Sequence, residues 1–292
     1  MSLPDGVNDK ATFWNNFRSH IDFMRVQLGV LNIEFQPRPG RGLYAQASAS
    51  PSTATIRTRC DSAITPAILA NHHWQIEELL FAKKLLETVP AAVVVDVGAN
   101  MGLFTRQVLG WCDNVKRAFA YEPEPDNFAC LLHNVACFNN VVPEMVGLAE
   151  TDGVFRLFLD LQNCGNNSLV SDDLAGAQTK GATEVKVINA AVEARRWLED
   201  GLPIFYKSDT QGYDEKIITL LPDEVWDNVI GGVIEIENID KPAFDMAKFT
   251  AFLDRYKNKV ILDQPETIVS TSEVLGYLNR GKGPGVDLGF WK

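Results

Sequence analysis

The run VVVDVGANMG, from Val93 to Gly102, most strongly limits what this chain can fold into. Its apolar start predicts a buried parallel strand over 93–97, and the glycine turn that follows opens an amphipathic helix over 102–111. Gly98 and Gly102 let the backbone approach a ligand with no Cβ in the way. Asp96, near the carboxyl end of the strand, can reach polar atoms of that ligand. The run therefore predicts a strand–turn–helix cradle for a cofactor.

A second apolar strand, predicted over 117–121, ends at Glu122. In doubly wound sheets an acid about 20 residues beyond the glycine turn binds a ribose diol, because a carboxylate accepts two hydroxyl hydrogen bonds at once. The same carboxylate repels a 2′-phosphate, which argues against a phosphorylated cofactor. We therefore expect Glu122 to bind the ribose of a nucleoside.

The turn itself differs from that of a dinucleotide site. It lacks the G-x-G-x-x-G spacing that lets a helix N-terminus meet a pyrophosphate, and Asn100 and Met101 add bulk where phosphates need room. A ligand without phosphates fits better, and S-adenosylmethionine is the obvious one. Two alternatives stay open: an NAD-dependent oxidoreductase on a Rossmann-like fold, and a non-catalytic relative that binds a nucleoside.

From residue 91 onward, strand and helix patterns alternate, which is typical of a parallel sheet covered by helices. Strands are predicted at 93–97, 117–121, 141–146, 203–208, 229–236, 259–263 and 287–291, and further helices at 125–138, 212–221 and 242–256. Two antiparallel strand patterns interrupt the alternation within an insertion at about 153–190. We therefore predict an α/β domain over 91–292, with a doubly wound, mostly parallel, seven-stranded Rossmann-like sheet and a small antiparallel insertion.

Residues 1–90 are predicted as an N-terminal helical appendage. Helix patterns cover 12–28 and 66–88, and the residues at 37–42 and 47–55, rich in Gly, Pro, Ala, Ser and Thr, are interpreted as a connector. We expect this appendage to act as a lid, as part of the acceptor pocket or as a homodimer contact.

Polar residues follow the strand predicted at 203–208. Lys207, Asp209 and Gln211 alternate there, and ligands of open α/β sheets bind outside such carboxyl ends. The next strand carries Glu235 and Glu237 on one face. Since a buried acid is costly unless it is paired, we expect at least one of these two to meet Lys207 or a ligand.

In their order along the chain, these segments resemble the pattern of FkbM-type S-adenosylmethionine-dependent methyltransferases. The resemblance covers about residues 90–240 and rests on DVGANMG at 96–102, Glu122-Pro123, Asn134, LAETDG at 148–153, Asn167-Ser168-Leu169, KSDTQGYD at 207–214 and IEIE at 234–237. Family members usually have an apolar residue where Ser208 stands and Glu where Asp214 stands. The resemblance implies a class I methyltransferase fold and methyl transfer to a hydroxyl of a sugar, a glycan or a small natural product.

The resemblance also implies roles for individual residues. Asp96, Gly98, Asn100 and Gly102 would hold the methionine and ribose part of the cofactor, Glu122 the ribose diol, and Asn127 and Ala149 would flank the adenine. Asp209 would be the general base or a metal ligand, with Lys207 and Gln211 near it. The donor is already activated, so catalysis needs mainly positioning and removal of the hydroxyl proton.

A metal site is a further hypothesis. Asp209, Glu237 and Asn238 occupy places similar to the ligands of catechol-type O-methyltransferases. Oxygen ligands suit Mg²⁺, which would lower the pKa of an acceptor hydroxyl. The alternative is that Glu237 and Asn238 cap the next helix or bond to Lys207. Glu124 and Asp126 are interpreted as solvated acids in the first turn of a helix.

Composition narrows the expected partners. The formal net charge is −11 with no basic cluster, so neither a nucleic acid nor an anionic membrane surface is expected as a partner. No apolar run is long enough to span a bilayer. Five cysteines without a C-x-x-C pair, and an N-terminus without a signal pattern, favour a cytoplasmic protein. The acceptor is expected to be a small molecule or a glycan.

Overall fold

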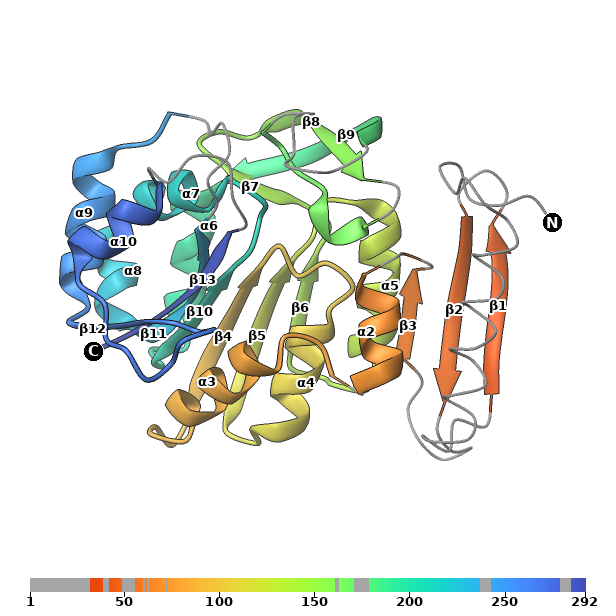
Figure 1. The fold of residues 1–292 in the computed structure, drawn as a ribbon, viewed down its shortest axis with the longest axis horizontal. Helices are drawn as coiled ribbons and strands as arrows, with labels where there is room; N and C mark the ends of the chain where they lie inside the picture. Colours follow the sequence, from red (N-terminus) through yellow and green to blue (C-terminus); the bar gives the residue numbers. More distant parts are fainter. Residues whose placement is uncertain are drawn as a thin grey trace.

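The computed structural model describes residues 32–38, 42–48, 56–59, 61, 63–71, 73–160, 163–170, 179–236, 243–278 and 285–292. The largest element is a central sheet with the strand order β12-β13-β11-β10-β4-β5-β6. In chain order its strands are β4 (Ala92–Val97), β5 (Val115–Tyr121), β6 (Val141–Glu144), β10 (Ile204–Ser208), β11 (Val229–Ile236), β12 (Asn258–Ile261) and β13 (Val286–Trp291). The seven-stranded, mostly parallel α/β sheet predicted from the sequence is confirmed (Figure 1).

One strand of the central sheet runs against the others. The strands β6, β5, β4, β10 and β11 pair in parallel, whereas β13 is antiparallel to both of its neighbours, β11 and β12. Numbered along the chain, the strands of this sheet lie in the order 3-2-1-4-5-7-6. The dinucleotide-binding order 3-2-1-4-5-6 has no strand inserted between its fifth and sixth.

The side chains of β4 alternate between two hydrophobic cores, one on each face of the sheet. Val93, Val95 and Val97 belong to the first core, and Ala92 and Val94 belong to the second. A strand has a side-chain period of two, so only a continuous apolar run can fill both cores. The valine run therefore forms an interior strand of a sheet that is covered on both faces.

Helices cover these two cores. The first core includes side chains of α6 (Ala190–Glu193), η2 (Ala194–Leu198), α7 (Asp214–Leu220), α8 (Asp223–Asn228), α9 (Met246–Arg255) and α10 (Thr271–Leu278). The second includes side chains of α3 (Ile76–Leu86) and α4 (Leu103–Trp111), and α5 (Pro125–Val135) packs beside α4. The sheet is thus doubly wound, as predicted. Among the described residues, no helix combines the length and apolar character needed to cross a bilayer.

The predicted insertion forms a second sheet with the order β7-β9-β8. β8 (Gly153–Asp160) and β9 (Thr179–Asn189) pair antiparallel, as the alternation predicted, and β7 (Gly147–Ala149) joins β9 in parallel. The short helix η1 (Cys164–Asn166) follows β8. Gly165 in this helix lies next to the side chain of Asn100, just after β4. The insertion therefore extends over the carboxyl edge of the central sheet.

The N-terminal segment differs from the helical appendage that the sequence predicted. A third sheet is formed by β1 (Asn32–Arg38), β2 (Gly42–Ser48) and β3 (Ile56–Arg59). The predicted connector at 37–42 and 47–55 therefore overlaps the ends of β1 and β2, and its residues 39–41 and 49–55 lie outside the described residues. Pro37 and Gly42 favour a connector in a prediction from sequence, because both residue types are rare in strands. Figure 1 shows β3 beside α5, with β1 and β2 farther from the central sheet.

The helix predicted at 66–88 is two helices, α2 (Ile64–Asn71) and α3. Gln75, just before α3, adopts a left-handed conformation with φ of 49°, which ends helical geometry there. The helix predicted at 12–28 lies outside the described residues.

Candidate functional site

A cavity of about 300 Å³ opens at the carboxyl edge of β4, β5 and β10. This volume lies at the lower end of the range for small-molecule sites. The lining comes from the segments that follow these strands, from the loop around η1 and from the residues before α3. Of the site residues predicted from the sequence, the following line it: Gly98, Asn100, Glu122, Asn127, Lys207, Asp209 and Gln211.

Gly98 makes the tight turn after β4. Its φ is +73°, a conformation that favours glycine, and its backbone N–H donates to the carbonyl of Tyr121 at 3.0 Å. A Cβ on Gly98 would lie 1.9 Å from the carbonyl oxygen of Asp209. Glycine is therefore required both by the backbone conformation and by the close approach of the segment after β10.

Glu122 lies at the end of β5, and each of its carboxylate oxygens accepts one backbone hydrogen bond. Oε2 accepts from the N–H of Asn100 at 2.9 Å, and Oε1 accepts from the N–H of Glu124 at 2.8 Å. Each oxygen keeps a further lone pair for a ligand. Burial raises the pKa of Glu122 to about 8, since the backbone hydrogen bonds and the charge of Arg59 only partly oppose it. A strongly perturbed carboxyl group beside a cavity marks a candidate functional site.

Buried polar atoms without partners point to a polar ligand in this cavity. Among the described residues, Asn100 Oδ1, Asn167 Nδ2 and Thr210 Oγ1 are buried and have no hydrogen-bond partner, and all three residues line the cavity. Buried polar atoms in proteins are nearly always hydrogen-bonded. An acceptor, a donor and a hydroxyl are thus left in one cavity for a ligand to satisfy.

Three residues predicted to contact the cofactor do not line the cavity. Asp96 is fully buried on the α4 side of β4, where it accepts a hydrogen bond from the Thr105 hydroxyl at 2.6 Å. Gly102 begins α4 and packs against Leu131 of α5. Ala149 is fully buried in the first core. The structure places all three behind the lining, as support for it.

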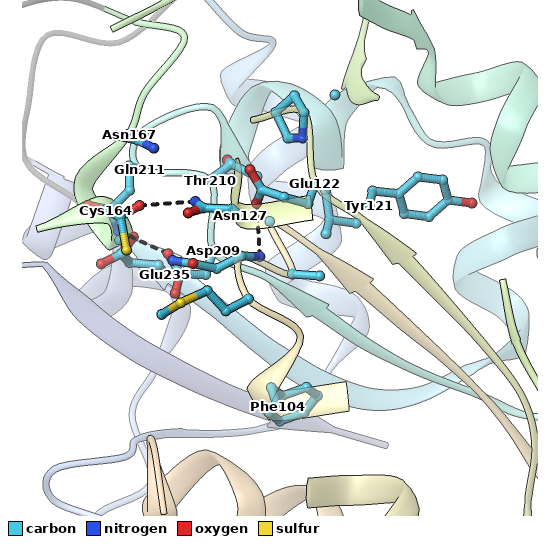
Figure 2. Close-up of a pocket in the computed structure, with 18 of the residues that line it drawn as sticks. Phe104, Tyr121, Glu122, Asn127, Cys164, Asn167, Asp209, Thr210, Gln211 and Glu235 are labelled. Atoms are coloured by element: carbon cyan, nitrogen blue, oxygen red, sulfur yellow. Dashed lines mark hydrogen bonds between the residues drawn. The ribbon is translucent and has the colours of Figure 1, made fainter. Parts of the chain in front are cut away.

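Asp209, directly after β10, is the centre of a hydrogen-bonded cluster in the lining of the cavity. Gln211 Nε2 donates to Asp209 Oδ1 at 2.9 Å and to Glu235 Oε2 at 2.6 Å, while Gln75 Nε2 donates to Asp209 Oδ2 at 3.3 Å. Figure 2 shows Asp209, Gln211 and Glu235 together, with Tyr121 on the opposite side of the view. Burial alone would raise the pKa of Asp209, but the charge of Lys207 and these hydrogen-bonded neighbours hold it below its usual value. Asp209 is therefore an ionised acceptor.

Lys207 is a buried cation held by carboxylates. Its Nζ lies 3.4 Å from Asp96 Oδ1 and 3.7 Å from Asp209 Oδ2, and it donates to the carbonyl of Gly98 at 3.2 Å. Burial works to lower the pKa of Lys207, but the charges of Asp96, Asp209 and Glu78 outweigh it and raise the pKa well above its usual range. Lys207 therefore stays protonated and orients Asp209. Glu235, one of the two acids expected to meet Lys207 or a ligand, is half-buried, accepts a hydrogen bond from Gln211 and lines the cavity.

Ser208 and Asp214 contact each other. Ser208 Oγ donates to Asp214 Oδ1 at 2.5 Å, and the backbone N–H of Thr210 also donates to the Asp214 carboxylate. Both side chains are buried. The shorter acid and the hydroxyl thus form one hydrogen-bonded unit that shapes the turn after β10.

Several site residues were missed by the sequence analysis. Arg59 NH1 donates to Glu124 Oε2 and to Asn127 Oδ1, at 3.0 Å in each case, and Gln75 reaches Asp209 from the segment before α3. The prediction that Glu124 and Asp126 are solvated is wrong, because each is only 3% exposed. The side chain of Glu124 caps α5 by accepting from the N–H of Asn127. Pro125 at the first position of the helix was the available signal for this cap.

Only one of the three predicted metal ligands belongs to the described residues. Asp209 lies in the cluster described above, whereas Glu237 and Asn238 lie outside the described residues. In the part of the chain that the structure describes, no group of three or more His, Cys, Asp or Glu side chains is arranged to hold a metal ion. The magnesium hypothesis gains no support from the residues that can be placed.

Known protein families and curated proteins give no match to this sequence. Solved structures with a similar arrangement of strands and helices do exist. One is the methyltransferase FkbM from Methylobacillus flagellatus, at 16% identity and a TM-score of 0.37, with 77% of this chain and 53% of that chain covered. This chain therefore spans about half the length of that protein.

Two further solved structures are similar to the same extent. Precorrin-6y C5,15-methyltransferase from Geobacter metallireducens has 15% identity and a TM-score of 0.34, covering 73% of this chain and 87% of that chain. Spermidine synthase from Thermotoga maritima has 14% identity and a TM-score of 0.33, covering 90% of this chain and 72% of that chain. At such values the likeness concerns the fold alone. The fold itself is that of an α/β protein with a Rossmann-like sheet and a cavity at its carboxyl edge.

Proposed function

We propose that this protein is an S-adenosylmethionine-dependent O-methyltransferase that acts on a hydroxyl of a sugar, a glycan or a small natural product. The observation that carries the proposal is Glu122, a buried acid at the end of β5 that lines the cavity and whose two oxygens each accept one backbone N–H. Such an acid accepts both hydroxyls of a ribose.

The surroundings of the glycine turn favour a nucleoside without a pyrophosphate. Met101 and Leu103, at the start of α4, are apolar side chains that line the cavity, and Gly102 packs against Leu131. A dinucleotide site needs an open, polar helix N-terminus for its phosphates. The strand inserted between the fifth and sixth strands of the sheet also departs from the dinucleotide-binding order. Both features weigh against an NAD-dependent oxidoreductase.

The residues present fit S-adenosylmethionine in two ways. Gly98 lines the cavity, and Asn100 Oδ1 is a buried acceptor with no partner among the described residues. We assign these two residues to the amino acid end of the cofactor, Glu122 to the ribose and Asn127 to the base. The bound cofactor would supply a methyl group already activated on a positively charged sulfur.

The cluster around Asp209 favours an acceptor that donates hydrogen bonds. Both hydrogens of Gln211 Nε2 are used, on Asp209 and on Glu235, and Lys207 is held by carboxylates and a carbonyl. What this cluster offers to the cavity is therefore mostly carboxylate oxygen. A hydroxyl group matches such acceptors, because its proton can bond to Asp209 while its oxygen lone pairs face the methyl donor.

Asp209 would orient the acceptor hydroxyl and accept its proton. A carboxylate with a lowered pKa is a weak base for a free alcohol, but the proton becomes acidic as the new carbon–oxygen bond forms. Lys207 would hold Asp209 ionised and in place throughout. This division of roles needs no metal ion.

Calorimetric titration with S-adenosylmethionine, S-adenosylhomocysteine and NAD tests the cofactor. We expect the first two to bind and NAD not to bind, whereas tight binding of NAD alone would refute the proposal. Methyl transfer from labelled S-adenosylmethionine to a panel of sugars and small phenols then tests the reaction. Asp209→Asn is expected to abolish transfer and to leave S-adenosylhomocysteine affinity nearly unchanged. Unchanged transfer by this variant would remove Asp209 from the proposed role.

A further inference from the structure

The strand β3 brings a positive charge from the N-terminal segment to the start of α5. Arg59, at the end of β3, donates through NH1 to Glu124 Oε2 and to Asn127 Oδ1, each at 3.0 Å. Its backbone N–H contacts the sulfur of Met101, and its carbonyl accepts from the hydroxyl of Thr65. Figure 1 shows β3 lying along α5. Arg59 is therefore fixed at several points, although it does not line the cavity.

Arg59 fixes the orientation of Asn127, which does line the cavity. Because a guanidinium can only donate, the amide oxygen of Asn127 must face Arg59. The amide nitrogen then faces the opposite way and donates to the carbonyl of Cys164 at 3.3 Å. Glu124 adds a third constraint by accepting the backbone N–H of Asn127 at 2.7 Å. The arginine and the cap together leave Asn127 with one arrangement.

Arg59 also sets the charge balance around Glu122. Three carboxyl groups gather at this end of α5, Glu122, Glu124 and Asp126, which are 5%, 3% and 3% exposed. After burial, the charge of Glu124 favours the protonated form of Glu122, and the charge of Arg59 favours the ionised form. Only the ionised carboxylate accepts both hydroxyls of a ribose.

We propose that Arg59 is a positioning residue of the nucleoside site, which sets the affinity for the cofactor by orienting Asn127 and supporting the ionised form of Glu122 without touching the cofactor. This inference rests on the proposed function, since it assumes that Glu122 binds a ribose. Through Arg59, the strand β3 of the N-terminal segment contributes to cofactor binding indirectly.

The test is the affinity for S-adenosylhomocysteine, measured by calorimetry between about pH 6 and pH 9 so that the titration of Glu122 is covered. The variants are Arg59→Met, Arg59→Lys and the control Arg117→Met, which removes a surface arginine paired with Glu199 and Asp200. Protonation of the ligand itself affects the wild type and every variant in the same way. We expect Arg59→Met to shift the pH midpoint of binding upward, and a rise of one pH unit weakens binding below the midpoint about tenfold. Arg59→Lys should keep most of the charge effect, and Arg117→Met should match the wild type.

Glu124→Gln gives the opposite sign and remains informative if Arg59→Met fails to fold. It removes the negative charge that raises the pKa of Glu122 but keeps an oxygen for the helix cap, so the midpoint should move downward. If Arg59→Met binds as the wild type does at every pH, Arg59 affects neither Asn127 nor Glu122 and the inference is wrong. Weaker binding at every pH with an unmoved midpoint would overturn the proposed support of the ionised Glu122. An upward or absent shift in Glu124→Gln overturns it as well. Failure of the wild type to bind S-adenosylhomocysteine would instead refute the proposed function.

Discussion

Replacing Gly98 by alanine tests how closely the turn after β4 is packed against the segment after β10. The added Cβ would lie 1.9 Å from the carbonyl oxygen of Asp209, and the backbone at Gly98 has a φ of +73°. Ordinary contact for such a pair begins near 3.4 Å, so the two segments would have to separate by 1.5 Å, which is 3.4 minus 1.9. Both the conformation and the space therefore oppose the substitution.

Two other glycines separate the effect of the backbone conformation from the effect of the missing space for a Cβ. Gly201 has a φ of +61° with nothing within 4 Å of an added Cβ, and Gly110 lies in α4 with open space and no positive φ. For Gly201→Ala we expect a loss of roughly 1–2 kcal/mol from the left-handed conformation alone. Gly110→Ala should stabilise the helix by about 0.5–1 kcal/mol. Gly98→Ala should lose the conformational term and a further ~1–3 kcal/mol from overpacking.

The assay is urea-induced unfolding of the three variants and the wild type, followed by circular dichroism and fluorescence and extrapolated to zero denaturant. The expected order of stability is Gly110→Ala, wild type, Gly201→Ala and then Gly98→Ala. If Gly98→Ala were as stable as Gly201→Ala, within about 0.5 kcal/mol, the close approach to Asp209 would have no energetic consequence and our reasoning about the turn would be wrong.

Two further predictions concern buried charge. Burial raises the pKa of Glu122 to about 8 and that of Asp287 to about 7, above the ordinary values of 4.5 and 3.8, so their stabilising contribution is complete below the ordinary values and is lost as pH rises through the raised ones. The ligand-free protein should therefore lose stability from about pH 4.5 to pH 8 through Glu122 and from about pH 3.8 to pH 7 through Asp287, by up to roughly 1.4 kcal/mol per pH unit for each group. Glu122→Gln should reduce this slope in urea unfolding, and an equal slope in the variant contradicts the assignment. Lys207→Met leaves Asp96 and Asp209 without their cation, and thermal unfolding should report a loss of about 3–5 kcal/mol; a loss below about 1 kcal/mol would mean that water compensates these carboxylates.

Much of the central sheet could be predicted because its information is local. A continuous apolar run such as 91–95 favours burial on both faces, and the glycine turn and Glu122 follow from spacing along the chain. Asp96 shows the limit of that reasoning. Its position near the strand end suggested a ligand contact, but the period of two directs it to the same side as Val94, where it meets Thr105 and Lys207.

The residues that the sequence analysis missed reach the site through non-local packing. Arg59 and Gln75 are far from Asn127 and Asp209 along the chain, and no spacing rule connects them. Their segment was also misinterpreted, because the Gly and Pro residues around 37–42 suggested a connector where β1 and β2 pair. Local propensity gives no indication of which distant element will cover a sheet edge.

A crystal structure of the protein with S-adenosylhomocysteine tests the central claim most directly. We expect the nucleoside in the cavity at the carboxyl edge of β4 and β5, with both ribose hydroxyls within about 2.5–3.0 Å of the Glu122 carboxylate. The sulfur should face Asp209. A nucleoside bound elsewhere, or a Glu122 carboxylate that contacts only the backbone N–H groups of Asn100 and Glu124, would contradict the account.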